Sequence, residues 1–174
     1  VYNYSFLNET VIQRFGLDPE EFVRVLNPIA SDQTHLRASL IPGIQKNIED
    51  NARYFDEFRL FEIGVEIHKN ESIGELPSEI FHLCAVVYHR EGDAGGLFDL
   101  KGLAETLTPG IETKPSAEPE VYEHPARVAD LVLSDQVVGR LFEFHPGFVE
   151  RGRAAVLDLN LDLLMKLARR ETRY

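Results

Sequence analysis

The chain has a single cysteine among its 174 residues, Cys84, so no disulfide and no thiolate metal cluster can form within it. Cys84 stands in an apolar run, and a lone cysteine in that setting favours a cytosolic origin. No apolar run approaches the length of about 20 residues that a membrane-spanning helix requires, so the sequence predicts no span. Internal repeats and low-complexity tracts are absent as well.

Basic residues are also scarce. Lysine and arginine total 18 against 29 aspartates and glutamates, which leaves a net charge of -11. Such a balance argues against a non-specific grip on nucleic acid, which needs a basic surface to displace counterions. The net charge does not exclude a local basic patch that contacts nucleic acid. The candidates gather near the end of the chain, where they complement a helix dipole or contact a tRNA backbone: Lys166, Arg169, Arg170 and Arg173.

Composition predicts one ordinary globular domain over residues 1–174, because 44% of the residues are hydrophobic and 27% are charged. The first residues, Val1 to Leu7, alternate as a strand does, and no initiator methionine precedes them. We therefore expect the chain to be a piece of a longer protein.

The stretch from Leu36 to Ile67 organises the rest. Ser39 is a candidate N-cap and Pro42 falls in the first turn, where its missing N–H costs little. Apolar residues then recur every four positions, which predicts a helix over Leu40–Tyr54 with one buried face. A mostly alternating run predicts a strand over Phe58–Ile67, where Gly64 indicates a bulge or a close backbone approach.

Further strands and helices follow from the same patterns. The segments 127–133 and 137–144 predict a β-hairpin around Ser134-Asp135-Gln136. Strands joined by hairpins, without strict βαβ alternation, indicate an α+β domain on a mostly antiparallel sheet flanked by helices. The remaining expected elements are strands over 1–7, 22–26, 121–122, 80–89 and 154–160, and helices over 8–15, 97–107, 147–149 and 162–170.

Several of these segments together resemble the beta subunit of bacterial-type phenylalanyl-tRNA synthetase, in its catalytic-like class II module. The order and spacing of the pieces carry the resemblance, which covers nearly the whole chain. They are LRASLIPG from Leu36, RLFEIG from Arg59, Tyr4-Ser5-Phe6, Asn27-Pro28, Phe98-Asp99-Leu100-Lys101-Gly102, His124-Pro125 with Arg127, Gly139, Glu143-Phe144-His145-Pro146, and LDLNLDLLMKL from Leu157.

The resemblance implies a class II aminoacyl-tRNA synthetase-like fold and a role without chemistry of its own. In that family the alpha subunit is catalytic, and an (αβ)₂ assembly charges tRNA-Phe with phenylalanine using ATP and Mg²⁺. This module would then scaffold the alpha subunit in the cytoplasm, and other domains would hold most of the tRNA. No cofactor is expected in the module itself.

Arg59 and Glu62 are the candidate site residues. They stand where the resemblance places an arginine that pairs with the ATP α-phosphate and its neighbouring glutamate, and a guanidinium suits that task. The Gly-rich segment leading to a second nucleotide-binding arginine has no counterpart. We therefore interpret Arg59 and Glu62 as relics of a nucleotide motif that now make structural ion pairs or surface contacts, and we expect no catalytic residue.

The alternative is a free-standing class II-like enzyme that activates an amino acid with ATP through Arg59 and Glu62. A third possibility is an interaction domain unrelated to tRNA charging. The missing Gly-rich segment with its second nucleotide-binding arginine favours the scaffold over the enzyme. The matches along the whole chain favour the scaffold over an unrelated interaction domain.

Other catalytic or metal sites are not indicated. The histidines are scattered, and the odd separation of His82 and His89 places them on opposite faces of one strand, so we expect no metal site. Ser39 and Ser134 lack a nucleophile elbow, and Gly92, Gly95 and Gly96 form no phosphate-binding fingerprint. The resemblance implies a large apolar interface with the alpha subunit, but the sequence assigns no individual residue to it. Apolar side chains that fill either the core or that interface are Tyr2, Tyr4, Phe6, Tyr54 and Phe55.

Overall fold

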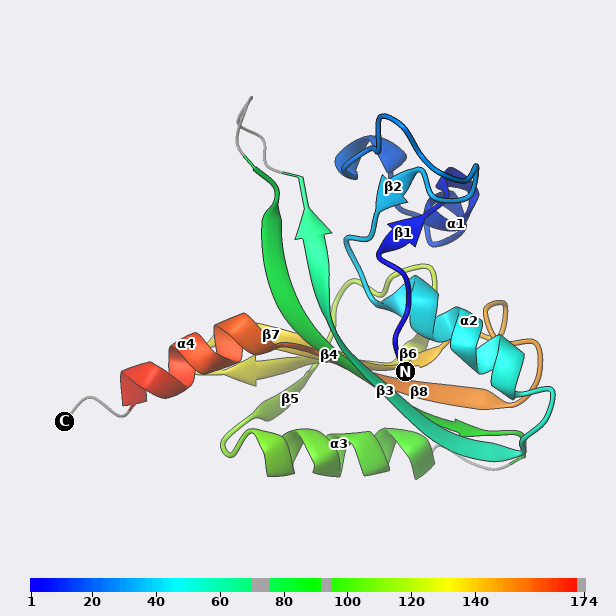
Figure 1. Ribbon diagram of the computed structural model, residues 1–174. Coiled ribbons are helices and arrows are strands. Elements are labelled where there is room, and N and C mark those ends of the chain that lie inside the picture. The colour runs from blue at the N-terminus through cyan, green and yellow to red at the C-terminus, as the bar shows by residue number, and fades with distance from the viewer. Residues whose placement is uncertain (70–75, 92–94, 172–174) are drawn as a thin grey trace.

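The computed structural model describes residues 1–69, 76–91 and 95–171, without the side chains of 169–171 (Figure 1). Six strands form one antiparallel sheet in the order β3-β4-β8-β7-β6-β5. Their bounds are β3 Glu57–His68, β4 Ser78–His89, β5 Glu112–Pro115, β6 Glu123–Leu133, β7 Gln136–Phe144 and β8 Arg153–Asn160. The expected α+β fold on a mostly antiparallel sheet is confirmed.

Helices cover both faces of this sheet. Helix α2 (Ile41–Asn51) lies on one face, and α3 (Gly95–Leu107) and α4 (Leu161–Glu171) lie on the other. We name these the α2 face and the α3 face. A smaller unit stands above the α2 face and contains β1 (Phe6–Leu7), α1 (Glu9–Arg14), a 3₁₀ turn at Pro19–Glu21 and β2 (His35–Leu36).

The two sides of the sheet have separate apolar cores. On the α2 face, Leu40, Ile44 and Ile48 pack against Val86 and Val156. On the α3 face, the core is made by small and branched residues of strands and helices, including Ala85, Leu100, Ala104, Leu157 and Leu167. Strands in the middle of the sheet are therefore apolar on both faces, as the centre of segment 80–89, Ala85-Val86-Val87, predicts.

Helix α2 begins one residue later than predicted. Leu40 is its N-cap, and the Leu40 N–H donates to Glu66 Oε1 at 3.0 Å. Ser39 Oγ accepts the Ile41 N–H at 3.1 Å, but Ser39 does not occupy the cap position. The helix ends at Asn51, whose carbonyl accepts the N–H groups of Tyr54 and Phe55 in a turn.

Four other predicted elements differ from the structure. The strand expected over 1–7 is confined to Phe6–Leu7, and segment 22–26 makes only an isolated bridge between Arg24 and His35. The residues expected as a short strand at 121–122 and a short helix at 147–149 are turns. The hairpin is confirmed, because β6 and β7 pair from Leu133↔Gln136, and the turn residues Ser134 and Asp135 have positive φ angles of 49° and 60°.

Gly64 has a different role from either one predicted. Strands β3 and β4 pair without interruption from Glu57↔His89 to His68↔Ser78, so Gly64 is not in a bulge. The close neighbour is a side chain, because a Cβ on Gly64 would lie 2.5 Å from Arg37 Nη2. The missing side chain therefore makes room for a buried guanidinium.

We predict that Gly64→Ala destabilises the protein by about 1–3 kcal/mol, because the added methyl displaces the Arg37 guanidinium. Urea denaturation measures the loss. Gly102→Ala is the control, since a Cβ on Gly102 meets nothing within 4 Å. An unchanged midpoint for Gly64→Ala would contradict this account of the glycine.

Candidate functional site

The α2 face of the sheet carries charged groups among its apolar residues. Glu62 and Glu66 are buried on β3, and Glu123 is buried at the start of β6. One row across the sheet pairs Glu62 with Cys84 and Cys84 with Asp158, and Asp158 in turn with Arg140. Buried charges of this kind persist only when they are paired, so their partners define what the face can do.

Glu62 is fully engaged by this chain's own groups. Its Oε1 accepts a bond from Arg37 Nη1 at 2.7 Å, and its Oε2 accepts one from Asn3 Nδ2, also at 2.7 Å. The Glu62 side chain is 2% exposed. Arg37 Nε donates in addition to the Val65 carbonyl at 3.0 Å, so the guanidinium bridges the segment before α2 to strand β3.

Arg59 lies on the other side of the strand. Three positions separate it from Glu62, and an odd separation puts two residues of a strand on opposite faces. Its side chain is 74% exposed and its Nη2 lies 2.8 Å from Asp99 Oδ2 of α3. The structure therefore does not bring Arg59 and Glu62 into one site.

A second network occupies the far side of the α2 face. Arg140 on β7 donates from Nη2 to Glu123 Oε2 at 2.6 Å and from Nη1 to Asp130 Oδ1 at 2.8 Å. The hydrogen bond to Glu123 raises the pKa of Arg140 above its ordinary value. The arginine is thus held by its own carboxylates and is not directed at a ligand.

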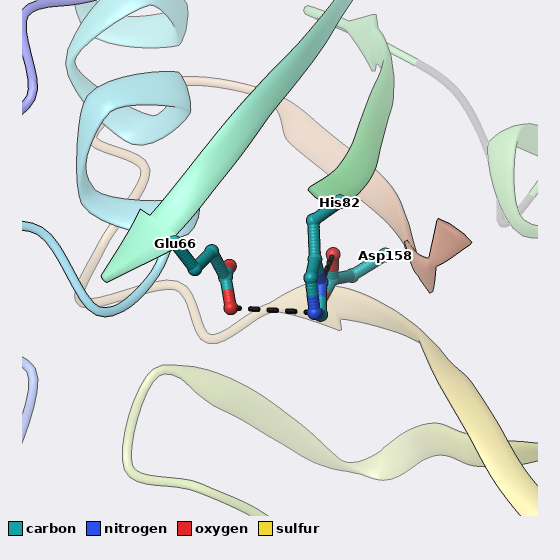
Figure 2. A group of neighbouring side chains, drawn as sticks. All are labelled: Glu66, His82 and Asp158. Atoms are coloured by element: carbon teal, nitrogen blue, oxygen red, sulfur yellow. Dashed lines mark hydrogen bonds and ion pairs between the residues drawn. The ribbon is translucent and has the colours of Figure 1, made fainter. Parts of the chain in front are cut away.

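Between these networks lies a third group, made by Glu66, His82 and Asp158 (Figure 2). His82 Nδ1 lies 2.9 Å from Asp158 Oδ1, and His82 Nε2 lies 3.4 Å from Glu66 Oε2. Burial lowers the pKa of His82, but the hydrogen bond and charge of Asp158, with the charges of Glu66 and Asp162, raise it above 6.5. Each of the three offers a ligand atom within 4.8 Å of the others.

Cys84 sits beside these carboxylates and is buried. Burial raises the pKa of the Cys84 thiol well above its usual value, and the negative charges of Asp158, Glu66 and Glu62 raise it further. A thiol held protonated in this way is a poor nucleophile and a poor metal ligand. The cysteine therefore belongs to the core.

The other histidines take structural positions. The Nδ1 atoms of His124 and His145 accept backbone N–H groups two residues ahead, as turn-forming side chains do. His89 lies on the α3 face, opposite to His82, as their spacing predicts. Of the tail basics, Arg173 and the side chains of Arg169 and Arg170 lie outside the described residues, as does Gly92.

A pocket of about 400 Å³ lies away from these charged groups. It is formed where the end of α2 meets the loop between β7 and β8, and Ile48, Ala52, Arg53 and Val149 line it. Its lining has no nucleophile with an adjacent base. Within the described parts of the chain, the α2 face offers ion pairs in place of an open site.

Sequence reasoning missed Arg37, Glu66 and Asp158 as partners. One signal was available, because Glu62, Gly64 and Glu66 alternate with apolar residues along β3. Two glutamates on the same face of a half-apolar strand indicate a buried polar row. Their partners come from distant segments, and the sequence alone does not identify them.

These features place the chain in a known class of fold. Pyrrolysyl-tRNA synthetase from Desulfitobacterium hafniense matches 97% of this chain with a TM-score of 0.75, and the chain covers 62% of that protein's chain. The sequence identity is 14%, so the likeness establishes the fold alone. The fold is that of a class II aminoacyl-tRNA synthetase.

The family follows from the sequence comparisons. The chain belongs to the family of the phenylalanyl tRNA synthetase beta chain CLM domain, whose model matches residues 1–161. The phenylalanine–tRNA ligase beta subunit of Solibacter usitatus is 53% identical over the whole chain, and that of Xylella fastidiosa (strain Temecula1) is 29% identical over 93% of it. The chain spans 22% and 21% of these two relatives.

The resemblance to the beta subunit is thereby confirmed. Among the described residues, no helix is both long enough and apolar enough to cross a bilayer.

We predict that Arg37→Leu destabilises the protein by about 3–5 kcal/mol, because Glu62 is left as a buried charge without its cation. Arg59→Leu is the matched control. It should lower the free energy of unfolding by no more than about 1 kcal/mol, because the ion pair of Arg59 is exposed. Urea denaturation of both variants measures the difference. Equal losses would contradict the distinction between the two faces.

We predict a pH-dependent contribution from His82. Its pKa is raised in the folded state, so the stabilisation is complete below pH 6.5 and is lost as the pH rises through the folded pKa. The difference in unfolding free energy between wild type and His82→Gln should therefore be larger at acidic than at alkaline pH. Asp158→Asn should reduce this pH dependence, and denaturation curves recorded with a chelator across the range test both statements.

Proposed function

We propose that this chain is the non-catalytic, catalytic-like module of a phenylalanyl-tRNA synthetase beta subunit, and that it scaffolds the alpha subunit. The observation that carries the proposal is the closed α2 face. Two arginines on that face, Arg37 and Arg140, are bound to Glu62, Glu123 and Asp130. A nucleotide would have to break these buried pairs before either guanidinium could reach a phosphate.

The relic interpretation of Arg59 and Glu62 fits this proposal. Arg59 makes a surface ion pair with Asp99, and Glu62 makes a buried one with Arg37. The alternative, a free-standing enzyme that activates an amino acid with Arg59 and Glu62, requires both side chains at one substrate. Their placement on opposite faces of β3 argues against it.

The parent complex supplies the chemistry in this proposal. We infer an (αβ)₂ ligase of the cytoplasm whose alpha subunit charges tRNA-Phe with phenylalanine, using ATP and Mg²⁺. The present chain is one module over residues 1–174 and holds none of these cofactors. Its net charge of -11 supports tRNA binding mostly by other domains.

The surface proposed to meet the alpha subunit is apolar and lies at the β3 edge of the sheet. Phe61 and Ile63 on β3 and Phe81 on β4 are each about half exposed, and Tyr2 is 96% exposed. The Val1 amino group donates to the Phe61 carbonyl at 2.8 Å, which ties the first residues to this edge. We name Tyr2, Tyr4, Phe61, Ile63 and Phe81 the β3-edge surface.

Several arguments favour this surface. Strand β3 is the last strand of the sheet, and a cluster of exposed apolar side chains along it is a liability unless a partner covers them. Aromatic residues are also enriched in the centres of subunit interfaces. The sequence assigned no individual interface residue, and the choice of these five residues rests on their exposure in the structure.

Co-expression of the full-length beta subunit with its cognate alpha subunit tests the proposal. Wild type should co-purify with alpha, and the double variant Phe61→Ser/Ile63→Ser should bind it at least about tenfold more weakly. Val137→Ser is the control, because Val137 is 57% exposed, close to the 59% of Phe61, but lies at the β6–β7 hairpin.

Two outcomes would contradict different parts of the proposal. A wild-type beta subunit that does not bind alpha would overturn the scaffold function. Wild-type binding by the double variant would leave the scaffold intact and overturn the choice of the β3-edge surface.

A further inference from the structure

The pocket at the end of α2 has an apolar floor. It lies where the last residues of α2 meet the loop between β7 and β8 (Figure 1). Ile48, Ala52 and Val149 form the floor, and all three belong to the buried core of the α2 face. The volume of about 400 Å³ is within the range of binding pockets in proteins. We name this cavity the α2-end pocket.

Hydrogen bonds hold the loop that closes the pocket. Gln45 is buried on α2, and its Nε2 donates to the Phe148 carbonyl at 2.7 Å. The Tyr88 hydroxyl donates to the Arg151 carbonyl at 2.9 Å. The pocket is therefore preformed, and a bound segment would not have to order the loop.

The rim of the pocket carries two arginines whose charges this chain does not balance. Glu49 on the rim is already paired with Arg14 Nη2 at 3.3 Å. Among the residues that the structure describes, no carboxylate forms an ion pair with Arg53 or Arg151. The exposed Glu150 offsets one of these two charges, so the rim remains locally positive on a chain whose net charge is -11.

Two aromatic side chains extend this surface. Tyr54 and Phe55 directly follow Arg53 in the turn after α2, and they are 81% and 54% exposed. They therefore do not fill the core, which was one of the two places that the sequence allowed. Arginines and aromatic residues around an apolar pocket are the composition typical of the energetic centre of a protein interface.

We propose that the α2-end pocket is a docking site for an acidic peptide segment of a partner protein. One apolar side chain of that segment packs against Ile48, Ala52 and Val149. Its carboxylates bind Arg53 and Arg151, because a guanidinium matches a carboxylate in charge and geometry. Charge complementarity selects the acidic segment, and the apolar floor selects the side chain that anchors it.

A nucleic acid suits this surface less well than a peptide. Phosphate backbones bind best to a continuous basic surface, whereas Glu150 interrupts the rim here and the whole chain is acidic. The pocket is also separate from the β3-edge surface, because Phe61 and Ile63 point to the α3 face and the pocket is built on α2. This inference is independent of the scaffold function.

Calorimetric titration of the purified chain with the capped peptide acetyl-Asp-Phe-Asp-amide tests the site. We expect saturable binding with a Kd of roughly 0.1–1 mM, as is usual for a short segment with one anchor. Replacing the peptide's phenylalanine with alanine should weaken binding at least about tenfold, because the apolar floor then stays unfilled. Replacing both aspartates with lysine should abolish binding.

Variants of the chain locate the binding to the pocket. Arg53→Glu and Arg151→Glu should each weaken binding of the acidic peptide at least about fivefold, because an attraction becomes a repulsion. Arg24→Glu is the matched control and should bind as wild type does. Arg24 is also exposed, and it makes no ion pair within the described parts of the chain, but it lies in the smaller unit. Circular dichroism establishes that each variant is folded.

Four results would overturn the proposal. The first is no saturable heat with wild type at peptide concentrations up to about 10 mM. The second is equal affinity for the phenylalanine and alanine peptides, which would indicate charge attraction without the pocket. The third is wild-type affinity in both Arg53→Glu and Arg151→Glu. The fourth is tighter binding of a single-stranded DNA oligonucleotide than of the peptide, which would assign the surface to nucleic acid.

Discussion

The buried ion pair between Arg37 and Glu62 is the constraint on which the α2 face depends. It connects the segment before α2 to strand β3, and it requires Gly64 as the neighbour that leaves space for the guanidinium. Asn3 satisfies the second oxygen of Glu62, which draws the first residues of the chain to the same point. Helix α2, the chain start and the edge of the sheet are thereby held in one arrangement.

Under the proposed scaffold role, this arrangement accounts for a class II fold without chemistry of its own. The sheet face beneath α2 has arginines and carboxylates, which a nucleotide site also needs, but here they bind one another. The cost of burying each charge is offset by its partner, so the networks stabilise the fold only while they remain closed. An interior used in this way supports a scaffold better than an active site.

Local patterns predicted most of the fold. The four-residue apolar period marked α2, alternation marked β3, and Ser134-Asp135 marked the hairpin. The strand predicted over 22–26 is not formed, because its β-prone residues have only the two-residue strand β2 beside them. The pairing is therefore limited to one bridge. For the site, the sequence indicated Glu62 but not Arg37, because contacts between segments 25 residues apart depend on the tertiary fold.

Calorimetric titration of the chain with Mg-ATP, with and without phenylalanine, tests the central claim most directly. The catalytic alpha subunit complex serves as the positive control for the same ligands. We predict no saturable heat in the millimolar range, because Arg37 and Arg140 on the α2 face are held by this chain's own carboxylates. Saturable ATP binding that is lost in Arg59→Ala would contradict the scaffold account and place the chain among the catalytic class II enzymes.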